Sequence, residues 1–163
     1  MNYQEKLKTL REKNSEVYKL KSEIIDISSD IFEDFYKYIF EKYPTLESFG
    51  WSQYTPYFND GETCVFYANT SYLTVNKECV DEADWSQKTK VLNWGTWNKD
   101  TKKYEGRVEE DNVDYDSILT EASNEIVNFL EHFDNDFYLI KFGDHAEITV
   151  NKNGVDISDY DHD

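Results

Sequence analysis

The chain has 163 residues, with 34 acidic and 17 basic side chains and a formal net charge of −17 at pH 7. Aromatic residues make up 17% of it, which excludes global disorder, because disordered acidic chains are poor in aromatic side chains. No stretch approaches the roughly 20 apolar residues that span a bilayer, and the N-terminus lacks an apolar signal core. The sequence therefore predicts a single cytoplasmic domain over residues 1–163.

The charge is unevenly placed along the chain. Residues 1–22 carry six basic side chains against three acidic ones, a local charge of +3. Residues 105–163 carry seventeen acidic side chains against three basic ones, a local charge of −14. A nucleic acid or an anionic membrane needs a cationic surface, so we expect neither as a direct partner. The remaining candidates for what contacts the acidic segment are a basic partner protein, a cation or solvent.

Residues 3–43 are predicted to be helical, and Pro44 ends the helix because proline cannot donate a helical hydrogen bond. Three polar residues interrupt a heptad-like apolar stripe, which weakens the prediction of a coiled coil. A Ser-Ser-Asp run at residues 28–30 resembles a helix start. Two arrangements remain open: one continuous helix, or a basic, protruding first helix over 1–22 and a more buried second one. The stripe consists of Tyr3, Leu7, Leu10, Val17, Ile24, Ile31, Phe35 and Tyr38, interrupted by Asn14, Lys21 and Ser28.

The middle of the chain is predicted to form short strands. Residues rich in β-branched and aromatic side chains alternate there with turn residues such as Asn59-Asp60-Gly61, which tolerate a left-handed backbone. Residues 77–89 are polar and are predicted to be a loop. The predicted strands are 46–54, 63–68, 72–75, 90–97 and 104–108, joined as hairpins by turns at 59–61, 69–71 and 98–103.

In the last third of the chain, apolar residues return to helical spacing over residues 113–133. Asp114 or Asp116 lies near the start, where a carboxylate stabilises a helix by interacting with its dipole. Three more strands, 137–142, 146–150 and 155–157, are predicted to form a meander, and residues 158–163 to fray as an acidic tail. This order predicts an α+β fold in which N-terminal helices and one later helix pack on a mainly antiparallel sheet.

The densest motif is the string WSQYTPYFNDGE at residues 51–62. With the later Phe-Gly-Asp-His-Ala at residues 142–146, it resembles uncharacterised small acidic proteins of bacteriophages and bacteria. The resemblance covers less than half of the chain and brings no activity with it.

The same string is a candidate partner-binding site. Its aromatic side chains would form a shelf with polar residues at the rim, and such shelves stack bases or bury a partner's anchor residue. The alternative, which is more common for aromatic residues at strand spacing, is a strand packed beneath the helices. The shelf would consist of Trp51, Tyr54, Tyr57 and Phe58, with Asn59 and Asp60 at its rim.

A second candidate surface is acidic. Asp114, Glu121 and Glu125 fall at similar angles on the predicted helix, so they would form a row of carboxylates. Such rows, about 6 Å apart, imitate a phosphate backbone and steer a basic partner. The alternative is a solvated face that keeps the protein soluble. The whole candidate surface comprises Glu109, Glu110, Asp111, Asp114, Glu121 and Glu125.

No pattern indicates an enzyme, and we expect no catalytic residue and no cofactor. Cys64 and Cys79 form neither a disulfide framework nor a zinc motif. The histidines lie beside carboxylates, so a metal site is conceivable, although nothing in the spacing requires one. Its ligands would come from His132, His145, Asp134, Asp136 and Asp144.

Three functions therefore compete. The first is a non-enzymatic binding protein that occludes a basic, nucleic-acid-binding surface of a partner protein, as a phage or mobile-element inhibitor of host defence does. The second is a structural or accessory protein that forms homo-oligomers through helix 3–43. The third is a small metal- or ligand-binding domain that uses His132 and His145.

Overall fold

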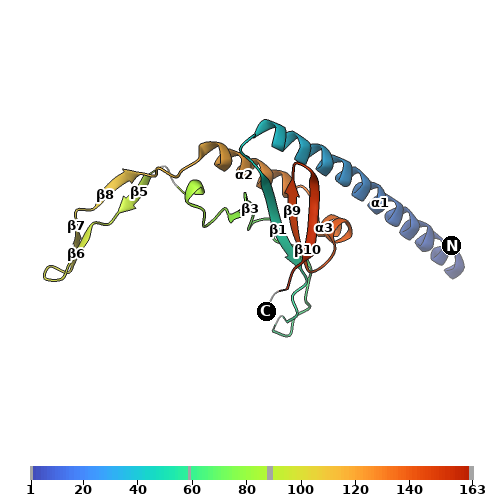
Figure 1. The fold of residues 1–163 in the computed structure, drawn as a ribbon. Coiled ribbons are helices and arrows are strands. Elements are labelled where there is room, and N and C mark those ends of the chain that lie inside the picture. The colour runs from blue at the N-terminus through green and yellow to red at the C-terminus, as the bar shows by residue number, and fades with distance from the viewer. Residues whose placement is uncertain (1, 59, 88–89, 162–163) are drawn as a thin grey trace.

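The computed structural model describes residues 2–58, 60–87 and 90–161. It confirms the α+β prediction: one long N-terminal helix and two later helices accompany mainly antiparallel sheets (Figure 1). The chain has two projections from the body, the N-terminal half of the long helix and a hairpin arm (Figure 1).

The long helix, α1 (Tyr3–Lys42), is continuous, so the helix start at residues 28–30 is wrong. A reciprocal capping box opens it: the Glu5 amide donates to the Asn2 side chain (2.9 Å) and the Asn2 amide to the Glu5 carboxylate (2.7 Å). Between residues 2 and 24 only Leu7 is even half-buried, and the buried residues of α1 begin at Phe32. The segment with the basic residues 1–22 therefore lies outside the core.

The central sheet is built around β1 (Ser48–Tyr54), which pairs antiparallel with β9 (Ala146–Asn151) along six residue pairs. β9 pairs in turn with β10 (Gly154–Asp159) across the predicted turn at 151–154. On β9, Ala146, Ile148 and Val150 are buried and Glu147 is exposed. This alternation is expected for a sheet that packs one of its two faces on the core.

The other edge of β1 differs from the prediction. β2 (Tyr67–Ala68) and β3 (Thr74–Val75) both pair with β1, not with each other, so the hairpin around residues 69–71 is wrong. Residues 63–66 are not a strand. β3 instead forms a tight hairpin with β4 (Glu78–Cys79), a strand in the segment 77–89 that was predicted to be a loop. The two residues of its turn, Asn76 and Lys77, have positive φ angles of 51° and 70°.

The predicted hairpin around residues 98–103 is confirmed and is longer than expected. β6 (Thr96–Asn98) pairs with β7 (Lys103–Glu105), and β5 (Lys90–Asn93) pairs with β8 (Val108–Asp111), as two separate two-stranded sheets. We call residues 90–111 the hairpin arm. Figure 1 shows it extending away from the central sheet.

Two helices follow the arm. α2 (Ser117–Leu130) begins after Asp116, whose carboxylate accepts from the amides of Ile118 (2.8 Å) and Leu119 (3.0 Å). α3 (Asn135–Phe142) occupies the segment predicted to be a strand, so that prediction is wrong. Asp134 caps α3 through the Phe137 amide (2.9 Å). A short apolar run does not by itself distinguish a buried strand from a helix.

The core joins α1, α2 and α3 to the buried face of the sheet. Phe32 of α1 is fully buried at its centre, and Trp51 of β1 is 2% exposed. The buried Gln53 side chain accepts from the Trp51 indole (3.1 Å) and donates to the Tyr138 carbonyl (3.1 Å), so β1 is tied to α3 by hydrogen bonds as well as by packing.

The C-terminal segment is more ordered than predicted. Ser158 and Asp159 belong to β10, and the Tyr160 amide donates to the His145 carbonyl (2.8 Å), so the fraying predicted from residue 158 is wrong at these positions. Residues 162–163 of the predicted tail lie outside the described residues. Within the described ranges, no helix has the length and apolarity needed to cross a membrane.

Candidate functional site

The hairpin arm changes direction between its two ladders. Gly95 and Gly106 lie at this break with φ angles of 71° and 79°, a backbone region that favours glycine. A Cβ atom at Gly95 would lie 2.0 Å from the Glu105 carbonyl oxygen. The bend of the arm therefore depends on a glycine at position 95.

Aromatic side chains gather at this bend. Trp97 and Tyr104 are cross-strand partners with ring centroids 5.0 Å apart, and Trp94 lies 5.8 Å from Tyr104. The Arg107 guanidinium lies 4.6 Å from the Trp94 ring centroid, within cation–π range. These three rings are 47–52% exposed. The hairpin was predicted from the sequence, but this cluster was not, although the Trp-x-x-Trp spacing at residues 94–97, beside a turn, was a usable signal.

Glu109, Glu110 and Asp111 lie on β8, on the half of the arm nearest the body, and all are exposed. Glu110 accepts from the Asn93 side-chain amide (3.1 Å), and Asp111 pairs with Lys90 across the ladder. Surface ion pairs of this kind contribute about 0–1 kcal/mol. These carboxylates therefore remain available to a partner.

The predicted row of carboxylates on α2 does not form. Asp114 lies in the turn before the Asp116 cap, outside the helix. Glu121 and Glu125 instead face the C-terminal end of α1, where the Tyr43 hydroxyl shares its single proton between Glu121 (3.0 Å) and Glu125 (2.8 Å). The prediction failed because it extended the helical register N-terminal to the true cap.

Glu125 is a structural group between α1 and α2. Lys42 forms an ion pair with it at 2.7 Å, and the Glu125 side chain is 28% exposed. Burial alone would raise the pKa of this carboxyl, but the hydrogen bonds from Lys42 and Tyr43 outweigh burial and hold the pKa below its ordinary value of 4.5. Hydrogen bonding to Glu125 is also the main reason that the pKa of Lys42 is raised.

Glu125→Gln should therefore lower the free energy of unfolding at pH 7 by about 1 kcal/mol, because a charge-assisted pair is lost. Because the pKa of Glu125 is lower in the folded chain, its contribution is complete above pH 4.5 and is lost as the pH falls through the folded pKa. Urea unfolding from pH 7 downward should show the variant and the wild type converging in acid. Glu109→Gln, the control, should stay within about 0.5 kcal/mol; a pH-independent difference at Glu125 would contradict this role.

The aromatic string does not form one shelf. Trp51 is in the core, with its ring edge-on to Phe142 at 5.4 Å, so it cannot contact a partner. Tyr54 is half-buried, and its hydroxyl accepts from Tyr67. Burial, together with this hydrogen bond, raises the pKa of Tyr67 to about 12. The first half of the string is therefore structural, as the more common alternative predicted.

The second half of the string lies at the surface. Tyr57 is 68% exposed and Phe58 77% exposed, and the Tyr57 ring stacks on the His145 imidazole at 4.8 Å between centroids. Asp60 is exposed with a φ angle of 34°, consistent with the predicted turn. Asn59 lies outside the described residues. Of the described residues of the predicted shelf, only Tyr57, Phe58 and Asp60 form an exposed surface.

His132 and His145, the two histidines among the described residues, are not gathered into a metal site. His132 Nδ1 lies 2.8 Å from the Asn128 carbonyl oxygen, and His145 Nε2 lies 3.9 Å from an oxygen of Asp144. Asp144 accepts from the Thr55 amide and hydroxyl, both at 2.7 Å. Among the residues that the structure describes, no group of three or more His, Cys, Asp or Glu side chains is placed to hold a metal ion.

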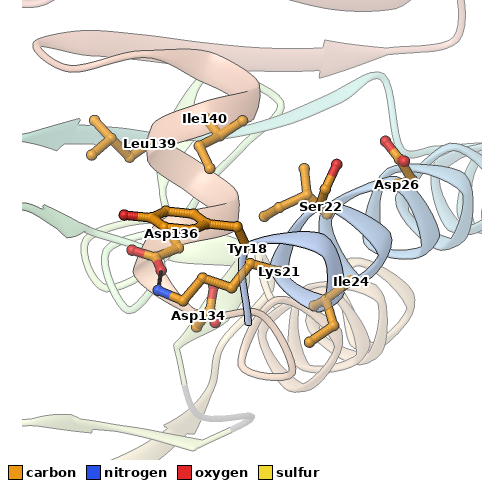
Figure 2. A pocket seen from close by; sticks show the side chains of 10 residues that line it. Tyr18, Lys21, Ser22, Ile24, Asp26, Asp134, Asp136, Leu139 and Ile140 are labelled. Carbon is orange, nitrogen blue, oxygen red and sulfur yellow. Dashed lines mark hydrogen bonds and ion pairs between the residues drawn. The ribbon is translucent and has the colours of Figure 1, made fainter. Parts of the chain in front are cut away.

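Residues of α1 and α3 line an open groove of about 660 Å³ (Figure 2). Lys21 of α1 reaches across it to Asp136 of α3, with 3.0 Å between Nζ and the carboxylate oxygen. This hydrogen bond and the charge of Asp136 raise the pKa of Lys21. Ile24 and Ile140 add apolar surface to its walls. The groove was not predicted from the sequence, because residues 137–142 were expected to form a strand and not the helix α3.

Comparison with known proteins adds no function to these observations: neither a protein-family model nor a curated protein nor a solved structure matches the chain.

Proposed function

We propose that this protein is a non-enzymatic binding protein that occludes a basic, nucleic-acid-binding surface of a partner protein, in the manner of an inhibitor from a phage or mobile element. The observation that carries the proposal is the hairpin arm. Among residues 90–111, all of which the structure describes, none is buried, yet the arm presents three large aromatic rings.

The aromatic cluster supplies the anchor. Trp, Tyr and Arg are the side chains that most often dominate the free energy of binding at protein interfaces. Trp94, Trp97, Tyr104 and Arg107 already contact one another, so little side-chain entropy is lost when a partner covers them. A lone two-stranded hairpin is at best marginally stable in water, and a partner on the rings would rigidify the arm.

The negative charge of the protein favours a basic partner. The net charge of −17 attracts a basic surface over long range and raises the association rate. On the arm, the carboxylates Glu109, Glu110 and Asp111 lie near the body, whereas Lys99, Lys102 and Lys103 lie around the tip. We therefore assign the basic surface of the partner to the half of the arm nearest the body.

The test begins with affinity capture from the source cells, using wild-type protein and the double variant Trp97→Ala/Tyr104→Ala as baits. We expect the wild type to capture a basic, nucleic-acid-binding protein, and the variant to bind the purified partner about 10–100-fold more weakly. Circular dichroism should show the variant folded, because both side chains lie outside the core. A partner that is not basic, or equal binding by both baits, contradicts the proposal.

The role of the β8 carboxylates is tested separately with Glu109→Gln/Glu110→Gln/Asp111→Asn. Stopped-flow association with the same partner should slow, and the dependence of binding on salt should become shallower. The matched control, Glu12→Gln/Glu41→Gln/Glu147→Gln, removes the same net charge from exposed positions outside the arm. Equal slowing by both triplets would leave only a general charge effect and reject a local acidic contact.

A further inference from the structure

A row of exposed apolar side chains runs along α1 on a face that does not enter the core. Its members are Leu10, Val17, Leu20, Ile24, Ile27 and Ile31, each 50–58% exposed. We call them the α1 seam. The buried residues of α1, Phe32, Ile39 and Phe40, lie on a different face of the helix, since they are one, eight and nine residues beyond Ile31 and each residue turns the helix by about 100°.

The α1 seam has the spacing of a coiled coil. Leu10, Val17, Ile24 and Ile31 are seven residues apart, and Leu20 and Ile27 each follow one of them by three. These are a and d positions of a heptad repeat, in which the exposed Lys13, paired with Glu16 at 2.8 Å, holds the d position between Leu10 and Val17. The stripe predicted from the sequence shares Leu10, Val17, Ile24 and Ile31 with the seam. It placed Lys21 and Ser28 between them as interruptions, where the seam has Leu20 and Ile27. In the structure Lys21 faces α3, so it does not interrupt the seam.

We infer that the α1 seam binds a second copy of this chain, as a parallel two-stranded coiled coil over residues 10–31. β-Branched residues at a, here Val17 and Ile24, with leucine at d, here Leu20, favour two parallel strands. Isoleucine at both a and d, as at Ile24 and Ile27, favours three or four strands, so the number of copies has to be measured. A projecting helix of this length with one apolar face gains most of its stability from whatever covers that face.

The flanking charges select the parallel direction. In this register Glu16 and Glu23 are at g positions and Lys21 is at an e position. Parallel helices bring Glu16 of one copy beside Lys21 of the other, an attractive pair, whereas antiparallel helices bring the g-position carboxylates beside one another. Lys21 already contacts Asp136 at 3.0 Å, and its ammonium has three donors, enough for both carboxylates.

The dependence of binding on salt concentration distinguishes this inference from the proposed function. Two copies bring together two basic segments of charge +3 and two chains of net charge −17, so screening should strengthen self-association. Binding to a basic partner should instead weaken with salt. The two ideas also use different elements, α1 and the hairpin arm, so either can fail alone.

Sedimentation equilibrium of the full chain over a range of concentrations tests the inference. We expect the wild type to reach twice its 19.4 kDa mass, and more readily at higher salt. Ile24→Glu/Ile27→Glu should remain at 19.4 kDa, because it puts charges into the seam. The control, Ser15→Glu/Ser22→Glu, adds the same charge on the opposite side of the helix and should still dimerise. A wild type that is monomeric throughout, or trimeric, overturns the inference.

Direction is tested by cross-linking. Cys64 and Cys79 are free thiols, so both are first replaced with serine. In that background Val17→Cys should form a disulfide between copies on mild oxidation, because parallel strands place the two a-position residues in one layer. Ser15→Cys, on the far side, should not cross-link. A dimer in which position 17 fails to cross-link, or cross-links no better than position 15, overturns the parallel arrangement.

Discussion

Replacing Phe32 with alanine is expected to lower the free energy of unfolding by about 3–5 kcal/mol, the usual cost of removing a buried ring and leaving a cavity. Phe32 has no exposed surface, and it connects α1 to both later helices and to β1. The rings around it, with centroids 5.5–6.4 Å away, are Tyr36, Trp51, Phe129, Phe133, Phe137 and Phe142. Rigid rings on every side cannot collapse into the space, so the loss should lie at the upper end.

Urea unfolding followed by circular dichroism measures this change, and Phe58→Ala provides a control with the same chemistry. Phe58 is 77% exposed, so its truncation should change the free energy of unfolding by no more than about 0.5 kcal/mol. If Phe32→Ala cost no more than the control, the aromatic cluster around Phe32 would not be the centre of the core.

Gly50→Ala should be at least as damaging, with an expected loss of about 3 kcal/mol or more, or failure to fold. Gly50 lies in β1 between β9 and β3, opposite Thr149 on one side and Thr74 on the other. A Cβ atom there would lie 2.2 Å from the Ile148 carbonyl oxygen. That oxygen belongs to the backbone of β9, so β1 and β9 would have to separate and lose ladder hydrogen bonds.

The control for this prediction is Ser52→Ala, two residues further along the same strand, where a Cβ atom is already accommodated. It should remain within about 1 kcal/mol of the wild type in urea unfolding. Thermal unfolding of Gly50→Ala should show a large fall in Tm. A fall no larger than that of Ser52→Ala would mean that the sheet can open at this position at little cost.

The sequence by itself determined the elements whose signals are local. The apolar repeat and Pro44 marked the helical segment 3–43, although not whether it is one helix or two, and the polar run at 98–103 marked the arm hairpin. Asp114 or Asp116 was placed near the start of the later helix, which Asp116 caps. Each of these depends on backbone preferences within a few residues, such as the missing proline donor or a carboxylate at a helix N-terminus. The α+β class followed from their order.

Only the tertiary structure decided between conformations that are locally equivalent. Residues 137–142 form a helix because Phe137, Tyr138 and Phe142 bury themselves against rings from α1 and β1, which no pattern within the segment reveals. β2 and β3 pair with different residues along the same edge of β1 instead of with each other, so the predicted hairpin does not form.

Some features of the candidate site were likewise predictable from the sequence, and others depended on the tertiary structure. The carboxylates of β8 remained at the surface as expected, but Glu125 was drawn into the fold by Lys42 and Tyr43, more than 80 residues earlier in the chain. Trp51 of the aromatic string lies in the core, whereas Trp97 and Tyr104 of the arm are exposed, although all three are aromatic residues in strands. Composition and spacing determine how much apolar and charged surface a segment has; which part of it is covered depends on contacts between distant segments, because burial is a property of the folded chain.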